Sequence, residues 1–457
     1  MNRRIFLSMA GAAGATAILG RAQTIDGAAG IVQFNLEAKA GWMRFADHQA
    51  HLYAYNNQVP GPIIEARPGD TLRIGFTNSL PEATNLHFHG LHVSPSGAAD
   101  NSLRMVASGE QFQYELPIPA NHPGGMFWVH PHMHGTVARQ VWRGLAAPLI
   151  IRGELDAIPE IQATPEVVLV LQDVTLGNNG EPVEPNFMEQ IAGREGSLIG
   201  VSGTANPQIP ITKDGWLRLR LINASCSRFY RLKLEEHVLN QISTDGGALP
   251  APIGMDELLL VPGQRTDLMI SGSRPPGSYR LLNLPYNRGA MGMGASFGGA
   301  AATTLATLTY QGQASQVFTL PQTLVPFQPL PSPATTRSFV LNSNMGMMSG
   351  RGTFGINGRA FDPGRIDTRV RLGDVEDWEL INPMGMDHPM HIHTNPFQIV
   401  QPDGSVEPAW RDIVLVRAGG RIRVRMAFQD FPGVLVYHCH ILDHEDLGMM
   451  GVLAINP

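Results

Sequence analysis

The chain has 457 residues, of which 43% are hydrophobic and 16% charged, and its formal net charge is −6. This length corresponds to about three domains, the composition excludes intrinsic disorder, and the negative charge argues against a nucleic acid as the main partner. Glycine and proline are frequent, at 50 and 35 residues. Such a turn-rich composition favours many short strands over long helices.

The first residues have the pattern of an export signal. Arg3 and Arg4 precede a weakly apolar run of mainly alanine and glycine between Ser8 and Leu19. The run is too short to span a membrane stably, and paired arginines before it are typical of the twin-arginine pathway. We therefore expect residues 1–23 to be a twin-arginine signal peptide. The mature protein is then expected to be periplasmic or extracellular and not membrane-spanning.

The rest of the chain is predicted to form β-sheet. Polar and apolar residues alternate at 71–76, 216–221 and 421–426, as they do in half-buried strands. Each run follows a glycine-containing turn and lies roughly 45–60 residues into one third of the chain, which is a weak internal repeat. The repeat predicts three successive β-sandwich units.

Proline-rich segments mark the expected domain boundaries. The clearest one contains Pro321, Pro326, Pro329, Pro331 and Pro333, a composition typical of an interdomain linker. We therefore expect a first domain at 24–153, a second at 154–312, a linker at 313–334 and a third domain at 335–457.

Ten of the 16 histidines gather in four short clusters. The clusters are His87-Phe88-His89, His130-Pro131-His132, His388-Pro389-Met390-His391-Ile392-His393, and His438-Cys439-His440 with His444. Residues i and i+2 of a strand point the same way, so each His-x-His pair presents two imidazoles to one metal site. Cys439 points opposite to its two neighbours, so one strand is expected to serve metal sites on both of its faces.

The ligand types in these clusters indicate copper. His388, Cys439 and His444 supply two imidazoles and a thiolate, and Met449 supplies a soft axial thioether. This is the ligand set of a blue-copper electron-transfer site. The other eight histidines can bind three more coppers with two positions open for oxygen, and the sulfur ligands favour copper over zinc or iron.

In this order the four motifs resemble those of the multicopper oxidases. The chain is similar to three-domain bacterial laccases and periplasmic cuprous oxidases over nearly its whole mature length. The resemblance implies an all-β fold of three consecutive cupredoxin-like Greek-key β-sandwich domains. It also implies four coppers per chain, with one type 1 copper in the third domain and a trinuclear cluster of one type 2 and two type 3 coppers between the first and third domains.

The resemblance also implies a ligand set for each copper. The type 1 ligands are His388, Cys439, His444 and Met449. The type 2 ligands are His87 and His391. One type 3 copper is held by His89, His130 and His440, and the other by His132, His393 and His438. Electrons then pass from Cys439 through its histidine neighbours to O₂, and Glu445 and Asp100 are the expected carboxylates for proton delivery.

A second set of residues is a candidate substrate site. The members either directly precede His388 or lie in the glycine-rich stretch 288–300, and they are Met384, Met386, Asp387, Met291 and Met293. Thioethers select Cu(I), so these methionines can bind a cuprous ion, and Asp387 can bind Cu(I) or orient a phenol. The alternative is that the methionines only pack as flexible apolar groups.

We therefore expect a monomeric, laccase-like multicopper oxidase. It would couple one-electron oxidation of phenols, aromatic amines or Cu(I) to the four-electron reduction of O₂ to water. The alternative is a non-enzymatic periplasmic copper-binding or copper-sequestering protein, which would bind copper without consuming O₂. The complete ligand set favours the oxidase, and the choice between a phenol and Cu(I) as natural reductant stays open.

Overall fold

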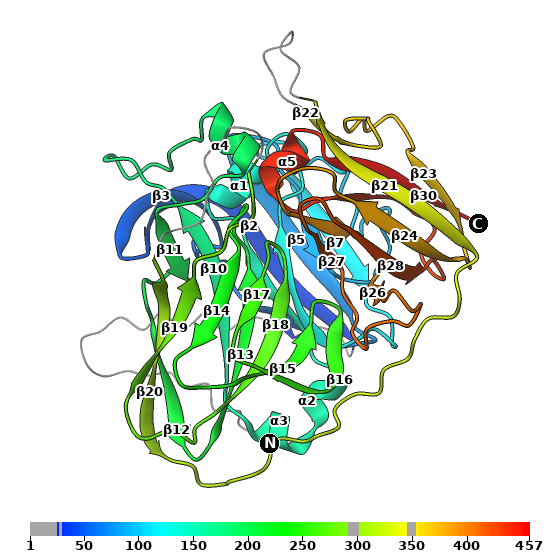
Figure 1. Ribbon diagram of the computed structural model, residues 1–457. Coiled ribbons are helices and arrows are strands. Elements are labelled where there is room, and N and C mark those ends of the chain that lie inside the picture. Colours follow the sequence, from blue (N-terminus) through cyan, green and yellow to red (C-terminus); the bar gives the residue numbers. More distant parts are fainter. Residues whose placement is uncertain (1–24, 27–29, 291–300, 345–352) are drawn as a thin grey trace.

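The computed structural model describes residues 25–26, 30–290, 301–344 and 353–457 (Figure 1). The expected signal peptide at 1–23 lies outside these residues. Strands predominate, helices are few and short, and the strands form three successive pairs of sheets. The predicted all-β fold is therefore confirmed. Among the described residues, none of the helices is long and apolar enough to span a bilayer.

Unit 1, the first pair of sheets, is built from residues 25–151. One sheet contains β1 (Ile25–Asp26), β2 (Ile31–Phe45), β3 (His48–Tyr55), β5 (Thr71–Ser79) and β7 (Gln111–Pro117). The other contains β4 (Ile64–Ala66), β6 (His87–His89), β8 (Gly125–His130) and β9 (Ala147–Ile151). The predicted strand at 71–76 lies in β5, where buried and half-buried residues alternate as expected. Phe76, Phe88 and Leu149 belong to the core of this unit.

Unit 2 is the second pair of sheets, from residues 166–313. One sheet has the order β11 (Leu198–Val201), β10 (Glu166–Val174), β13 (Trp216–Asn223), β18 (Arg265–Ser271), β15 (Leu239–Thr244) and β16 (Gly247–Met255). The other has the order β12 (Gln208–Lys213), β20 (Thr303–Gln313), β19 (Ser278–Leu284), β14 (Tyr230–Leu234) and β17 (Leu258–Leu260).

The predicted strand at 216–221 lies in β13, but it is not half-buried as expected. Arg218 and Arg220, which should face solvent, are only 2% and 0% exposed. They face Asp156 and Glu166, at the junction of units 1 and 2, with ion-pair distances of 2.7 Å from Arg218 to Asp156 and 3.5 Å from Arg220 to Glu166. The charged face of this strand is therefore covered by Asp156, in the segment between units 1 and 2, and by Glu166 of the paired strand β10, and its own sequence cannot reveal these partners.

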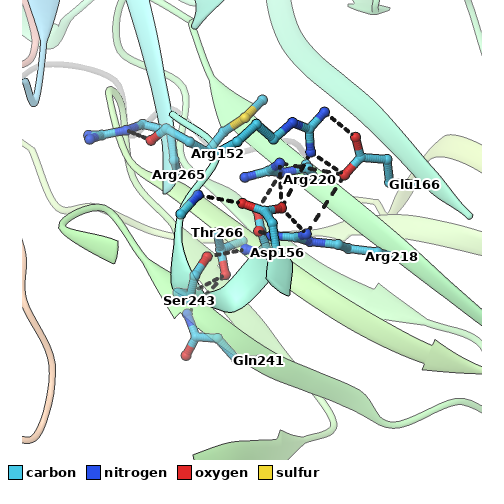
Figure 2. Close-up of polar contacts among 12 residues, drawn as sticks. Arg152, Asp156, Glu166, Arg218, Arg220, Gln241, Ser243, Arg265 and Thr266 are labelled. Carbon is cyan, nitrogen blue, oxygen red and sulfur yellow. Dashed lines mark hydrogen bonds and ion pairs between the residues drawn. The ribbon is translucent and has the colours of Figure 1, made fainter. Parts of the chain in front are cut away.

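Figure 2 shows how this junction is held together. Arg152, just after the last strand of unit 1, donates hydrogen bonds to Glu166 of β10 at 2.5 and 2.9 Å and to Asp156 at 3.3 Å. Burial raises the pKa of Glu166, but hydrogen bonds from Arg152 and the charges of three arginines outweigh it and lower the pKa to about 2. The junction therefore depends on an ionised carboxylate.

Because the folded pKa of Glu166 lies below its usual 4.5, its stabilising effect is present above about pH 4.5 and is lost as the pH falls toward 2. We expect the free energy of unfolding of the copper-free protein to fall over this range. Glu166→Gln is expected to cost about 3 kcal/mol at pH 7 and to flatten the acid dependence in urea titrations. A variant with the steep acid dependence of the wild type would contradict this role.

Unit 3 is the third pair of sheets, from residues 335–456. One sheet has the order β22 (Thr353–Ile356), β21 (Thr335–Asn344), β24 (Val375–Ile381), β28 (Arg421–Ala427) and β26 (Phe397–Val400). The other has the order β23 (Thr368–Arg371), β30 (Met450–Asn456), β29 (Gly433–Cys439), β25 (His388–Ile392) and β27 (Ile413–Val416). The predicted strand at 421–426 lies in β28.

The segments between the units are short helices or irregular chain. α2 (Glu154–Ala157) and α3 (Pro159–Ala163) join units 1 and 2. Residues 314–334 contain neither helix nor strand and run along the outside of the molecule to unit 3 (Figure 1). Three other helices, one from each unit, meet on one side: α1 (Val137–Trp142) and α4 (Phe187–Ala192) both contact α5 (Leu442–Asp446).

Candidate metal centres

Two pairs of antiparallel strands position the histidine clusters. In unit 1, β6 pairs with β8 so that His87 lies opposite His130. In unit 3, β25 pairs with β29 so that His391 lies opposite His438 and Met390 lies opposite Cys439. Within their sheets β8, β25 and β29 are paired on both sides, whereas β6 is an edge strand. The other ligands directly follow these strands or lie in α5, and they are His132, His393, His440 and His444.

The possible ligand atoms form five compact groups, in each of which the atoms lie within 4.8 Å of one another, and four of the groups contain only histidine and cysteine. These four are His87, His89 and His391; His89, His130 and His440; His132, His393 and His438; and His388, Cys439 and His444. All of these residues are buried. The three imidazole groups combine histidines of units 1 and 3, so this centre lies between those two units.

In the centre formed by the three imidazole groups, ring nitrogens point toward one another. Nε2 of His438 lies 3.2 Å from Nε2 of His132 and 3.1 Å from Nε2 of His393. Burial lowers the pKa of all eight rings, so they are neutral donors at pH 7.

Several of these buried nitrogens have no hydrogen-bond partner in the part of the chain that the structure describes. They are Nε2 of His87, Nε2 of His391, and both ring nitrogens of His440. A buried polar atom without a partner is costly, and a metal ion at this point would satisfy such nitrogens. The residues therefore fit a cluster of metal ions that prefer imidazole, as copper does.

The fourth group has a sulfur donor. Sγ of Cys439 lies 3.5 Å from Nδ1 of His388 and 3.9 Å from Nδ1 of His444, and the backbone N–H of Ile441 lies 3.4 Å from the sulfur. Met449 is buried beside it, since its carbonyl accepts a hydrogen bond from the backbone N–H of Cys439 at 3.0 Å. Two imidazoles, a thiolate and a neighbouring thioether fit copper.

The two expected carboxylates both contact ligands. Asp100 lies 3.0 Å from Nδ1 of His87 and accepts a hydrogen bond from the N–H of Phe88, so it fixes the orientation of that ring. Glu445 is fully buried, 3.0 Å from Nδ1 of His438 and 3.4 Å from Nε2 of His132. Burial raises the pKa of both carboxyl groups, to about 7 for Asp100.

Sequence reasoning missed an ion pair that links all three units at this centre. Asp412 of unit 3 lies 3.1 Å from Nε2 of His89 in unit 1, and its carbonyl accepts from Nδ1 of His391 at 2.8 Å. Arg265 of unit 2 donates to the two oxygens of Asp412 at 2.7 and 2.6 Å. Arg265 is 147 residues away from Asp412, so no local pattern points to the pair.

The candidate substrate residues are less open than expected. Met386 is buried and Met384 packs against the core of unit 3. The carboxylate of Asp387 accepts hydrogen bonds from Tyr286 at 2.5 Å and from the N–H of Ala418 at 2.8 Å. Met291 and Met293 lie outside the described residues.

Family models and known proteins match this chain over most of its length. Three family models, each described as multicopper oxidase, match residues 37–156, 167–313 and 331–457. The multicopper oxidase mco of Staphylococcus haemolyticus is 26% identical, covering 93% of this chain and 89% of that protein. The cell division protein FtsP of Xenorhabdus nematophila is 28% identical, with coverages of 92% and 88%. A solved Campylobacter jejuni multicopper oxidase, described as a metallo-oxidase, has a TM-score of 0.84 and 31% identity, with coverages of 96% and 94%.

Proposed function

The chain belongs to the multicopper oxidase family and is a copper oxidoreductase, and from that premise we propose that it holds four coppers and reduces O₂ to water with electrons from a small reductant. The observation that carries this proposal is the position of Cys439. It belongs to the thiolate group, while its neighbours His438 and His440 belong to two different imidazole groups. Covalent bonds thus join the two centres.

Bound copper supplies one-electron redox chemistry and the place where O₂ is reduced. The chain's own side chains then have separate tasks. Asp100 and Asp412 orient His87 and His89 through hydrogen bonds. Glu445, whose pKa burial raises, can hold a proton beside His132 and His438 and release it to oxygen that is being reduced.

Among phenols, aromatic amines and Cu(I), we propose Cu(I) as the first reductant to test. The Campylobacter jejuni relative is described as a metallo-oxidase, and this supports a metal ion. Met384 and Met386, close to His388 in the chain, are soft groups that suit Cu(I). Arg3 and Arg4 support export through the twin-arginine pathway. An exported oxidase would meet copper outside the cytoplasm.

The direct test is O₂ uptake by mature protein loaded with copper, with Cu(I) in one run and 2,6-dimethoxyphenol in a parallel run. We expect four coppers per chain and faster uptake with Cu(I). Faster uptake with the phenol would reverse the proposed order of reductants. No uptake with either reductant, at four coppers per chain, would refute the oxidase.

The similarity to the cell division protein FtsP over most of the chain favours, as a second candidate, a role other than oxidation of a small reductant. A non-enzymatic copper-binding or copper-sequestering protein would be one such role. This candidate predicts no O₂ uptake whatever the copper content. The same assay therefore separates the two.

Replacing Met449 with leucine is expected to raise the reduction potential of the copper at the thiolate group. Leucine has no thioether lone pair to stabilise the oxidised ion, and we expect a rise of about 60 mV or more, a tenfold change for a one-electron couple. Redox titration of the blue absorption measures it. Met450→Leu, at the buried neighbouring residue, is the control. An equal shift in both variants would contradict a role of Met449 in holding this copper.

A further inference from the structure

The outer nitrogen of His444 is covered by unit 2. Nδ1 of His444 faces Cys439, while Nε2 lies 2.9 Å from the carbonyl oxygen of Ile191 in α4. With Nδ1 as the metal donor, Nε2 carries the proton and donates it to that carbonyl. His444 has no exposed surface. Ile191 therefore lies where a reductant would otherwise contact this ligand.

A buried ion pair fixes this covering segment, residues 187–194, which we call the cap segment. Arg194 donates to the carboxylate of Asp443 from Nε at 3.0 Å and from Nη2 at 2.6 Å, and its backbone N–H donates at 3.0 Å. The two side chains are only 6% and 3% exposed. Asp443 directly precedes His444, so this bidentate ion pair ties the cap segment to the residue next to the ligand.

Two further features hold the cap segment close. Arg288 donates hydrogen bonds to the carbonyls of Ala192 and Gly193 at 2.7 and 2.6 Å. Gly193 has a φ of 76°, and a Cβ added there would lie 2.7 Å from Cγ2 of Ile441. The segment thus ends in a turn that only glycine suits, pressed against the strand-to-helix connection that precedes His444.

The cap segment forms a thin layer between His444 and solvent. Its first helical residues, Phe187 and Met188, are 39% and 50% exposed, whereas Ile191 is buried among the residues around Cys439. Figure 1 shows α4 beside α5, the helix that carries His444.

We propose that the cap segment, held by Arg194, determines which reductants the enzyme accepts. This inference rests on the proposed function. While the cap is closed, a reductant must give its electron without contacting His444, which suits a metal ion such as Cu(I) and disfavours a phenol. With the cap displaced, a phenol oxygen can accept the hydrogen bond from Nε2. In either case the reductant loses one electron per step, a phenol also loses its proton to solvent, and four electrons and four protons convert O₂ to two waters.

Arg194 is thus a positioning residue that acts through Ile191, and three variants test it. Arg194→Ala removes the ion pair. Arg194→Lys keeps the positive charge but cannot donate the two parallel hydrogen bonds of a guanidinium to the carboxylate. Gly193→Ala displaces the segment without changing a charge. Arg280→Ala is the matched control, because it removes an ion pair to Glu235 on the exposed surface of unit 2. The first readout is hydrogen–deuterium exchange of 187–194 in the copper-free protein. The second is the rate at which Cu(I) and 2,6-dimethoxyphenol each bleach the blue absorption without O₂.

We expect exchange of the cap segment to rise at least tenfold in Arg194→Ala, because the broken ion pair leaves a buried unpaired charge, and less in Arg194→Lys. A similar rise is expected in Gly193→Ala, because the added Cβ would lie 2.7 Å from Cγ2 of Ile441. The bleaching rate with the phenol should rise about tenfold relative to Cu(I), while Arg280→Ala should change neither. Faster exchange with an unchanged ratio of rates would overturn the role in specificity. Unchanged exchange would overturn the role of Arg194 in holding the cap.

If Arg194→Ala loses its blue absorption, Arg194→Lys and Gly193→Ala decide the question. Bleaching without O₂ measures only electron transfer from the reductant. A failure of the proposed O₂ reduction would therefore show in the uptake assay and would not change the ratio of the bleaching rates with the phenol and with Cu(I).

Discussion

Cys439→Ser is expected to abolish the blue absorption and to lower O₂ uptake at least about 10³-fold. Serine has nearly the shape of cysteine, but its hydroxyl is a hard donor that does not form the thiolate that copper requires at this site. The substitution also removes the sulfur that lies 3.5 and 3.9 Å from the two imidazoles. Absorption spectra and copper analysis of the loaded variant, with O₂ uptake, measure the effect.

The chain offers a matched control in its other cysteine. Cys226 is also buried, but its thiol lies 3.3 Å from the carbonyl of Ala138, and it is not a member of any ligand group. A serine hydroxyl can make the same hydrogen bond, so Cys226→Ser should keep both colour and turnover. If Cys439→Ser retained oxidase activity, electrons would have to reach O₂ by a path that avoids residue 439.

Glu445→Gln is expected to slow the reduction of O₂ by about 10²- to 10⁴-fold, the usual contribution of a positioned acid. Glutamine keeps the size of the side chain but cannot hold or release the proton that burial favours on this carboxyl group. Its place beside His132 and His438 makes it the buried carboxyl that contacts both rings. The measurement is the rate at which the fully reduced enzyme regains its blue colour after mixing with O₂.

Bleaching by Cu(I) in the absence of O₂ should be unchanged in Glu445→Gln, because that step needs no proton from this residue. Glu376→Gln is the control, since Glu376 is also fully buried in unit 3 but is paired with Arg337. Equal slowing in both variants would indicate general damage to unit 3 rather than loss of a proton donor.

Features that depend on the local period of side chains could be predicted from the amino-acid sequence. Side chains alternate along a strand, so His438 and His440 were predicted to lie on the face opposite to Cys439, and the structure places them in different ligand groups. The same alternation correctly located the strands at 71–76 and 421–426. The order of the four motifs was enough to indicate the family.

Features that depend on contacts between residues far apart in the chain became visible in the folded molecule alone. Alternation predicts that Arg218 and Arg220 face solvent, but they are buried in ion pairs with Asp156, between units 1 and 2, and with Glu166 of β10. The carboxylate of Asp387 is bound by Tyr286, 101 residues away.

The same holds around the copper ligands. The bond from His444 to Ile191 spans 253 residues, and the pair of Asp412 with His89 spans 323. The periodicity of a sequence reports which face of its own strand a residue occupies. It carries no information on which distant unit covers that face, and it is this packing between units that closes the cap over His444 and locks the imidazoles of the metal centre in place.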